Sequence, residues 1–173
     1  GNTLGIFGLG KQGLQVAGYA KAFGMNVIAW SHNLKQEDCE KVGVEYVNST
    51  DLFKMSDILT IHTRLSDRTR GYIDKNNLKL MKKESVIVNT SRGPIIKEHD
   101  LIKALNNNVI SFAALDVYDQ EPLPRDHILR KTKNLILTPH IGYVSEEAYE
   151  KFFNGYLKAI KAFINQKPIN QIS

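Results

Sequence analysis

The chain has 173 residues, of which 42% are apolar and 24% charged, and this balance is typical of a globular protein with one well-buried core. Its net charge of +5 comes from Lys and Arg residues scattered along the sequence, which argues against a nucleic-acid-binding stripe. No window has the roughly 20 apolar residues of a membrane helix, and the single cysteine, Cys39, excludes an intrachain disulfide and suits a reducing compartment such as the cytoplasm.

Apolar runs alternate with helical patterns along the chain. Strands are predicted at 3–7, 27–30, 44–47, 57–62, 85–89, 110–117 and 135–137. Helices are predicted at 11–23, at 49–55 with Ser49, Thr50 and Asp51 as N-cap residues, at 76–81, at 98–106 and from 145 onward. Because several strands are continuous apolar runs, the alternation predicts an α/β fold with a doubly wound parallel sheet of about seven strands and helices on both faces.

The last predicted helix has Ser145 as its N-cap and Glu146 and Glu147 in its first turn, where negative charge favours the helix dipole. An apolar stripe runs along it and consists of Ala148, Phe152, Phe153, Tyr156, Leu157, Ile160 and Ile164. Such a stripe is typical of a core or an interface rather than of a binding site.

A glycine loop lies between the first predicted strand and the first predicted helix. Its sequence GLGKQG matches G-x-G-x-x-G, and in this context the motif is typical of a Rossmann-type dinucleotide-binding fold. The first glycine permits a tight turn, the second lets the backbone approach a pyrophosphate, and the third lets helix and strand pack closely. The helix N-terminus favours phosphate. The candidate dinucleotide contacts of this loop are Gly8, Gly10, Lys11, Gln12 and Gly13.

The end of the second predicted strand bears on which dinucleotide fits. NAD-selective folds place an Asp or Glu about 20 residues after the glycine loop, where it binds the ribose hydroxyls. That position falls on Ser31, followed by His32 and Asn33, with Lys35 nearby, so no carboxylate would repel a 2′-phosphate. This segment also has no arginines that could bind a 2′-phosphate. We predict NAD as the cofactor, with NADP as the open alternative.

Polar residues follow the last three predicted strands, at the edge where ligands bind in doubly wound folds. They are Arg92, Asp116, Glu121 and His140. His140 can take or return a proton as hydride moves at the same carbon, and a nearby Glu121 would favour the imidazolium. Arg92 can bind a carboxylate, and Asp116 can accept a hydrogen bond from the nicotinamide carboxamide. Each of these residues, taken alone, could have a purely structural role. Four such residues at neighbouring strand ends favour a catalytic site.

Other candidate residues complete the site. The further candidate contacts with the dinucleotide are Ser31, His32, His62, Thr63 and Thr90, together with Arg92, Asp116 and His140 of the polar set. The histidines other than His140 are assigned to surface or supporting positions rather than to proton transfer. No Cys/His spacing indicates a metal site.

At these residues the chain resembles the nucleotide-binding domain of the D-isomer-specific 2-hydroxy acid dehydrogenases, which include D-3-phosphoglycerate, glyoxylate/hydroxypyruvate and D-lactate dehydrogenases. The resemblance spans about 3–148 and rests on the glycine loop, SDILTIHTRLSDRTRGYI, MKKESVIVNTSRGPIIKEHDL, AALDVYDQEP and LTPHIG. The segment GYLKAIKAFINQKPINQI resembles the closing helix and tail of that domain. The resemblance implies that Arg92, Glu121 and His140 are catalytic and that Asp116 binds the carboxamide.

The resemblance also implies an NAD(P)-dependent oxidoreductase that transfers hydride at C2 of a D-2-hydroxy or 2-oxo acid such as 3-phosphoglycerate, glycerate or lactate. It implies a homodimer and a separate substrate domain, which this chain lacks. We expect 1–148 to be the dinucleotide-binding domain, and 149–173 a closing helix and hinge segment toward the missing domain. A dinucleotide-sensing, corepressor-like scaffold of the same family is the alternative function.

The start of the chain and three departures from the family pattern add expectations. Because a strand begins almost at once after Gly1, we expect a part of a longer polypeptide that binds dinucleotide but turns over little or no substrate alone. Arg64 stands where the family usually has proline, so the loop over the adenosine is expected to differ. Lys97 replaces a common Asp at low cost, and Ser31 leaves the cofactor choice open.

Overall fold

The computed structural model describes residues 1–171. Its strands are β1 (Thr3–Phe7), β2 (Asn26–Trp30), β3 (Glu45–Tyr46), β4 (Ile58–Ile61), β5 (Val86–Asn89), β6 (Phe112–Leu115) and β7 (Leu135–Leu137). Its helices are α1 (Lys11–Ala22), α2 (Gln36–Glu40), α3 (Ser49–Met55), α4 (Lys75–Leu80), α5 (Glu98–Asn106) and α6 (Glu146–Ile164), with 3₁₀ turns η1 (Gly93–Ile95) and η2 (Ile128–Lys131).

All seven predicted strands and all five predicted helices are present, with ends shifted by a few residues. Helix α2 and the two 3₁₀ turns were not predicted. In α2 only Cys39 is buried, so the segment has no apolar periodicity to reveal it. The predicted N-cap of α3 was wrong, because the cap is Asn48, whose side chain accepts a hydrogen bond from Asp51 N–H at 2.9 Å.

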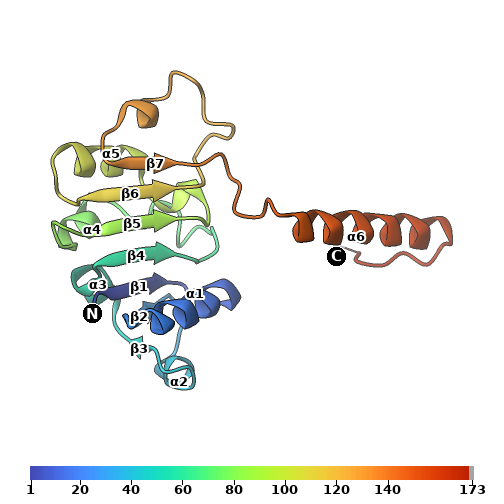
Figure 1. Ribbon diagram of the computed structural model, residues 1–173, viewed down its shortest axis with the longest axis horizontal. Coiled ribbons are helices and arrows are strands. Elements are labelled where there is room, and N and C mark those ends of the chain that lie inside the picture. The colour runs from blue at the N-terminus through green and yellow to red at the C-terminus, as the bar shows by residue number, and fades with distance from the viewer. Residues whose placement is uncertain (172–173) are drawn as a thin grey trace. The chain divides into compact units, whose positions relative to one another are not determined.

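The chain divides into two units, Gly1–His140 and Ile141–Ser173. The first unit contains one seven-stranded sheet in the order β3-β2-β1-β4-β5-β6-β7, and every neighbouring pair of strands is parallel (Figure 1). The predicted doubly wound α/β fold is therefore confirmed. Because the strands are parallel, all their carboxyl ends lie along one edge of the sheet, which is called the carboxyl edge below.

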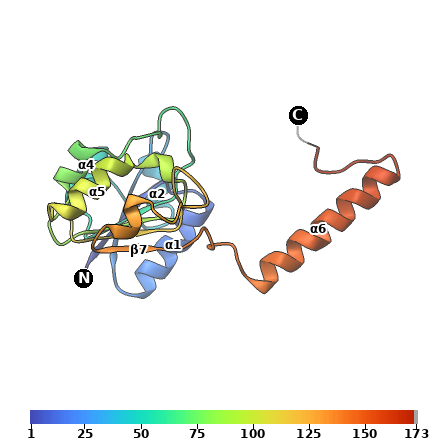
Figure 2. The same ribbon diagram turned by 90° about the horizontal axis from the view of Figure 1, so that it is seen from above.

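Helices cover both faces of this sheet, with α1 on one face and α4 and α5 on the other (Figure 2). The larger apolar core includes buried residues of α3, α4 and α5, and the smaller one includes residues of α1 together with Cys39 of α2. Each fully buried Leu or Ile stabilises the fold by about 1.5–3 kcal/mol. The α1 face is covered less well over β7, where Ile136 is 55% exposed.

The second unit is dominated by α6. Ser145 caps it as predicted, and its side chain accepts a hydrogen bond from Ala148 N–H at 3.2 Å. Glu146 and Glu147 lie in its first turn. No residue of α6 is buried, so the large side chains of its apolar stripe are left open to solvent in this chain. None of the helices in residues 1–171 is long and apolar enough to span a lipid bilayer.

Candidate active site

The glycine loop connects β1 to α1 at the carboxyl edge. Gly8 has a φ of +105°, and a Cβ added there would lie 2.6 Å from the backbone nitrogen of Thr63, at the end of β4. A Cβ on Gly13 would lie 2.3 Å from the carbonyl oxygen of Gly8. The first glycine thus permits the turn and the third lets α1 pack against the loop, as their spacing predicted.

The second glycine opens onto a cavity. Apart from the two residues next to it in the chain, no part of residues 1–171 lies within 4 Å of the position that a Cβ of Gly10 would occupy, and no side chain of these residues caps the N-terminus of α1. Backbone N–H groups of the first turn can therefore meet phosphate oxygens, which is what a dinucleotide pyrophosphate requires. The cavity measures about 410 Å³. The candidate dinucleotide contacts that line it are Gly8, Gly10, Lys11, Gln12, Ser31, His62 and Thr63.

The two histidines of this half of the edge differ in position. His62 lines the cavity, and its Nε2 lies 3.0 Å from Thr60 Oγ1. His32 lies outside the lining, with its ring packed against Trp30 and Tyr72 at centroid distances of 4.9 and 5.1 Å. Burial lowers the pKa of both imidazoles, and the positive charge of Arg68 lowers the pKa of His32 further.

The other half of the edge carries the predicted proton-transfer pair. His140 Nδ1 lies 2.5 Å from Glu121 Oε2, and Glu121 Oε1 accepts a hydrogen bond from Tyr118 N–H at 2.9 Å. Burial acts to raise the pKa of Glu121, but the bonds from His140 and Tyr118, with the positive charges of His140 and Arg92, bring that pKa below its ordinary value. The carboxylate is therefore ionised at neutral pH and orients the imidazole ring.

The backbone of His140 is unusual. Its φ is +56°, in the left-handed region that residues other than glycine rarely adopt and that is concentrated at functional sites. Its N–H donates to the carbonyl oxygen of Thr138 at 3.0 Å. A cavity of about 430 Å³ lies beside the histidine and is lined in part by Glu121, Leu123 and Arg130.

Two residues that the sequence did not single out hold this half together. Thr138 Oγ1 donates to Asp116 Oδ1 at 2.5 Å, and Tyr118 Oη donates to the carbonyl oxygen of Thr138 at 2.7 Å. Asp116 itself is only 6% exposed. The loops after β6 and β7 are thus tied to each other, although a lone Tyr or Thr beside a motif gives no sequence signal of such a role.

The loop after β5 is fixed by its own side chains. Asn89 Nδ2 donates to the carbonyl oxygen of Arg92 at 2.9 Å, and Asn89 Oδ1 accepts from Ser91 N–H at 3.0 Å. Ser91 Oγ donates to the carbonyl oxygen of Thr63 at 2.5 Å, which joins this loop to the end of β4. Thr90, the remaining candidate contact, is exposed in the same loop.

The same loop also reaches the segment that carries Glu121. A Cβ on Gly93 would lie 2.1 Å from the carbonyl carbon of Tyr118, so only glycine allows this approach. Arg92, the residue before, contributes the positive charge that helps to lower the pKa of Glu121. The structure therefore brings Arg92, Asp116, Glu121 and His140 to one half of the carboxyl edge, and the glycine loop to the other half.

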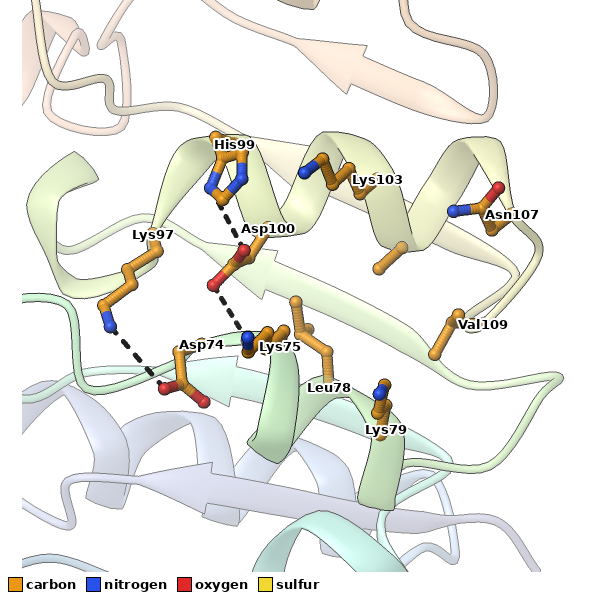
Figure 3. Close-up of a pocket in the computed structure, with 11 residues that line it drawn as sticks. Asp74, Lys75, Leu78, Lys79, Lys97, His99, Asp100, Lys103, Asn107 and Val109 are labelled. Carbon is orange, nitrogen blue, oxygen red and sulfur yellow. Dashed lines mark hydrogen bonds and ion pairs between the residues drawn. The ribbon is translucent and has the colours of Figure 1, made fainter.

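A third cavity, also of about 430 Å³, lies away from these residues, between α4 and α5 (Figure 3). Its carboxylates are already engaged. Asp74 pairs with Lys97 at 3.6 Å, and Asp100 accepts from Lys75 N–H and pairs with His99, both at 3.0 Å. Asp74 also caps the N-terminus of α4, and the contacts of Lys97 and Lys75 tie α4 to α5. No predicted site residue lines this cavity.

Comparison with known proteins bears on what the carboxyl edge is for. Residues 1–142 match the family described as D-isomer specific 2-hydroxyacid dehydrogenase, NAD binding domain. The chain belongs to this family. The resemblance seen in the motifs is thereby confirmed, and the fold is that of a nicotinamide dinucleotide-binding domain.

Two relatives illustrate the match. The chain is 46% identical over 147 residues to a glyoxylate reductase of Aeropyrum pernix, covering 85% of this chain and 44% of the relative. It is 45% identical over 149 residues to a D-3-phosphoglycerate dehydrogenase of Methanocaldococcus jannaschii, covering 86% of this chain and 28% of the relative. The chain therefore spans less than half the length of these two relatives.

Solved structures agree with this assignment. An oxidoreductase from Ralstonia solanacearum has a TM-score of 0.94 at 40% identity, covering 100% of this chain and 51% of that one. A D-lactate dehydrogenase from Aquifex aeolicus, complexed with NAD and lactic acid, has a TM-score of 0.85 at 28% identity. The match covers 99% of this chain and 58% of that one. An acyclic imino acid reductase, in complex with NADPH and D-Arg, has a TM-score of 0.81 at 33% identity. The match covers 99% of this chain and 54% of that one.

Proposed function

We propose that this chain is the cofactor-binding part of an NAD(P)-dependent D-2-hydroxy acid dehydrogenase, which interconverts a small 2-hydroxy acid and its 2-oxo acid. Candidate substrates are 3-phosphoglycerate, glycerate and lactate. The observation that carries the proposal is the 2.5 Å contact between His140 and Glu121, on the same sheet edge as an open glycine loop. Relatives named glyoxylate reductase and D-3-phosphoglycerate dehydrogenase support this class of substrate.

The glycine loop and the residues around it are assigned to cofactor binding. The N–H groups at the start of α1 would bind the pyrophosphate, and Ser31 would lie near the adenosine ribose. Asp116 would accept a hydrogen bond from the nicotinamide carboxamide and so set which face of the ring is presented. The nicotinamide, when bound, supplies or accepts the hydride.

The polar half of the edge is assigned to the substrate. His140 would exchange a proton with the substrate oxygen through Nε2, because Nδ1 is held by Glu121. The ionised Glu121 stabilises the protonated ring. Arg92 would bind the substrate carboxylate through its planar guanidinium group, which matches the geometry of two oxygens.

The rest of the protein is proposed to complete the site. The relatives are more than twice as long as the matched region, which leaves room for a substrate domain. Residues 149–173, of which 172 and 173 lie outside the described residues, would form the closing helix and hinge segment toward it. The uncovered apolar stripe of α6 fits burial against that domain or in a homodimer. We assign the protein to the cytoplasm, where a free thiol such as that of Cys39 stays reduced.

A calorimetric titration of the 173-residue chain tests dinucleotide binding. We expect one site for NADH or NADPH, and no oxidation of either on adding glyoxylate or hydroxypyruvate, because these 173 residues span less than half the length of the relatives. Gly10→Ala should weaken binding at least tenfold, since the new methyl group enters the pyrophosphate cavity.

The matched control is Gly18→Ala on α1, where a Cβ also meets nothing within 4 Å. This variant should bind like the unmodified chain. If the chain bound neither dinucleotide, or if Gly10→Ala and Gly18→Ala behaved alike, the proposed cofactor site would be wrong.

A further inference from the structure

The loop after β4 holds a fixed shape next to the end of β2. Thr69, which is 4% exposed, donates from Oγ1 to the carbonyl oxygen of Arg64 at 2.7 Å and accepts from Ser66 N–H at 2.8 Å. Arg70 N–H closes the turn by donating to the carbonyl oxygen of Ser66 at 2.8 Å. Leu65 anchors the loop in the larger apolar core. The positions of its arginines are therefore set by a buried threonine and a packed leucine.

Arg68 reaches from this loop to the segment after β2. Its Nη1 lies 3.4 Å from Asn33 Oδ1. With the amide of Asn33 turned over, Nη2 donates to its oxygen at 3.3 Å while the amide nitrogen donates to the carbonyl oxygen of His32 at 3.3 Å. In either orientation a guanidinium group stands beside the segment where an NAD-selective fold has its acidic residue.

A second arginine of the loop faces the dinucleotide cavity. Arg64 lines it together with Ser31, Asn33 and Lys11. Among residues 1–171, Asp38 is the one carboxylate of the lining, and it is paired with Lys41 at 3.1 Å. The adenosine end of the cavity is therefore positively charged.

We infer that Arg64 and Arg68 form a binding site for the 2′-phosphate of NADP(H), and that this chain selects NADP(H) over NAD(H). The inference rests on the proposed function and names the cofactor of that site. A guanidinium group pairs with phosphate through two parallel hydrogen bonds, whereas the ribose diol of NAD(H) offers it no charge. The prediction of NAD from the sequence did not include this pair of arginines, because both come from a loop about 30 positions beyond Ser31.

Paired titrations of the 173-residue chain test the inference. The first pair is NADPH and NADH, and the second is adenosine 2′,5′-bisphosphate and 5′-AMP, whose members differ only in the 2′-phosphate. We expect the phosphorylated member of each pair to bind at least tenfold more tightly at low salt. The advantage should shrink as salt is added, because exposed charges are screened.

Three variants then assign the effect to residues. Arg64→Gln and Arg68→Gln should each remove most of the preference for the 2′-phosphate while changing NADH binding less than twofold. Arg70→Gln removes the same charge from the same loop, but Arg70 acts on Asp119 rather than on the cavity, so this control should keep the preference. All three side chains are exposed, and we expect unchanged melting temperatures.

The outcomes separate this inference from the proposed function. If both dinucleotides bind and NADPH has no advantage, the 2′-phosphate site is wrong and the proposed function stands. If Arg68→Gln weakens NADH and NADPH equally, Arg68 only shapes the loop and the inference is wrong. If neither dinucleotide binds, the proposed function is wrong and the inference falls with it.

Discussion

The two halves of the carboxyl edge are built by different means. The half at β1 and α1 is made of backbone, with glycines where a Cβ would collide with Thr63 or with the loop itself. The half at β5 to β7 is made of side chains joined by short hydrogen bonds, such as Thr138 to Asp116 and His140 to Glu121. A backbone site suits a phosphate group that many enzymes share, whereas a side-chain network suits one particular proton transfer.

The largest effect is expected from the side-chain half. In the full-length protein, His140→Gln should lower kcat/KM for the 2-oxo acid by about 10²–10⁴-fold, which is the usual share of a general acid or base. Dinucleotide affinity should fall much less than the rate, because His140 is only one of the candidate contacts with the dinucleotide and the glycine loop is untouched. Steady-state kinetics together with a calorimetric titration make the comparison. Equal losses in rate and in dinucleotide binding would contradict the division between the two halves.

The next effect concerns the backbone half. Gly13→Ala places a Cβ 2.3 Å from the carbonyl oxygen of Gly8, so we expect a loss of about 1–3 kcal/mol in unfolding free energy and weaker dinucleotide binding. Gly18→Ala, in the same helix but with open space around it, should stabilise the chain by about 0.5–1 kcal/mol. Urea denaturation measures both variants. Unchanged stability of Gly13→Ala would show that α1 can move away from the glycine loop.

The two halves of the carboxyl edge could be predicted from the sequence to different degrees. The glycine loop was predictable in detail, because its spacing reports a backbone geometry that only glycine allows. The pairing of Glu121 with His140 was predictable as a convergence of strand ends, and the 2.5 Å contact confirms that geometry. The contact between Arg68 and Asn33 was not predictable, because it depends on how a loop folds back over residues far away in the sequence.

A smaller effect is expected from the hydrogen bond between the loops after β6 and β7. Thr138→Val keeps the shape of the side chain but removes the donor to Asp116, which is buried. We expect a loss of about 1 kcal/mol in unfolding free energy, the usual net contribution of one intramolecular hydrogen bond. Thr138→Ser retains the hydroxyl and should recover most of that loss. Thermal or urea denaturation measures the stability of both variants. Equal stabilities of Thr138→Val and Thr138→Ser would contradict a stabilising role of this hydrogen bond.

The smallest effect is the pH dependence carried by Glu121. Its pKa in the folded chain lies below the ordinary 4.5, so its contribution to stability is present above pH 4.5 and is lost as the pH falls through the folded value. The gain is modest, because its side chain is 34% exposed. In urea titrations from pH 7 to pH 3, Glu121→Gln should lose less stability than the unmodified chain. A steeper loss in the variant would contradict the sign of the shift.

The most direct test of the account is to map dinucleotide binding onto the backbone of the ¹⁵N-labelled chain by NMR. Adding NADPH should shift the amide signals of Gly8, Gly10, Thr63 and Asp116, which would place the cofactor along both halves of the carboxyl edge. The signals of Lys75, Lys79 and Lys103, in the cavity between α4 and α5, should stay in place. Shifts confined to the cavity between α4 and α5, or no shifts with either dinucleotide, would contradict the account.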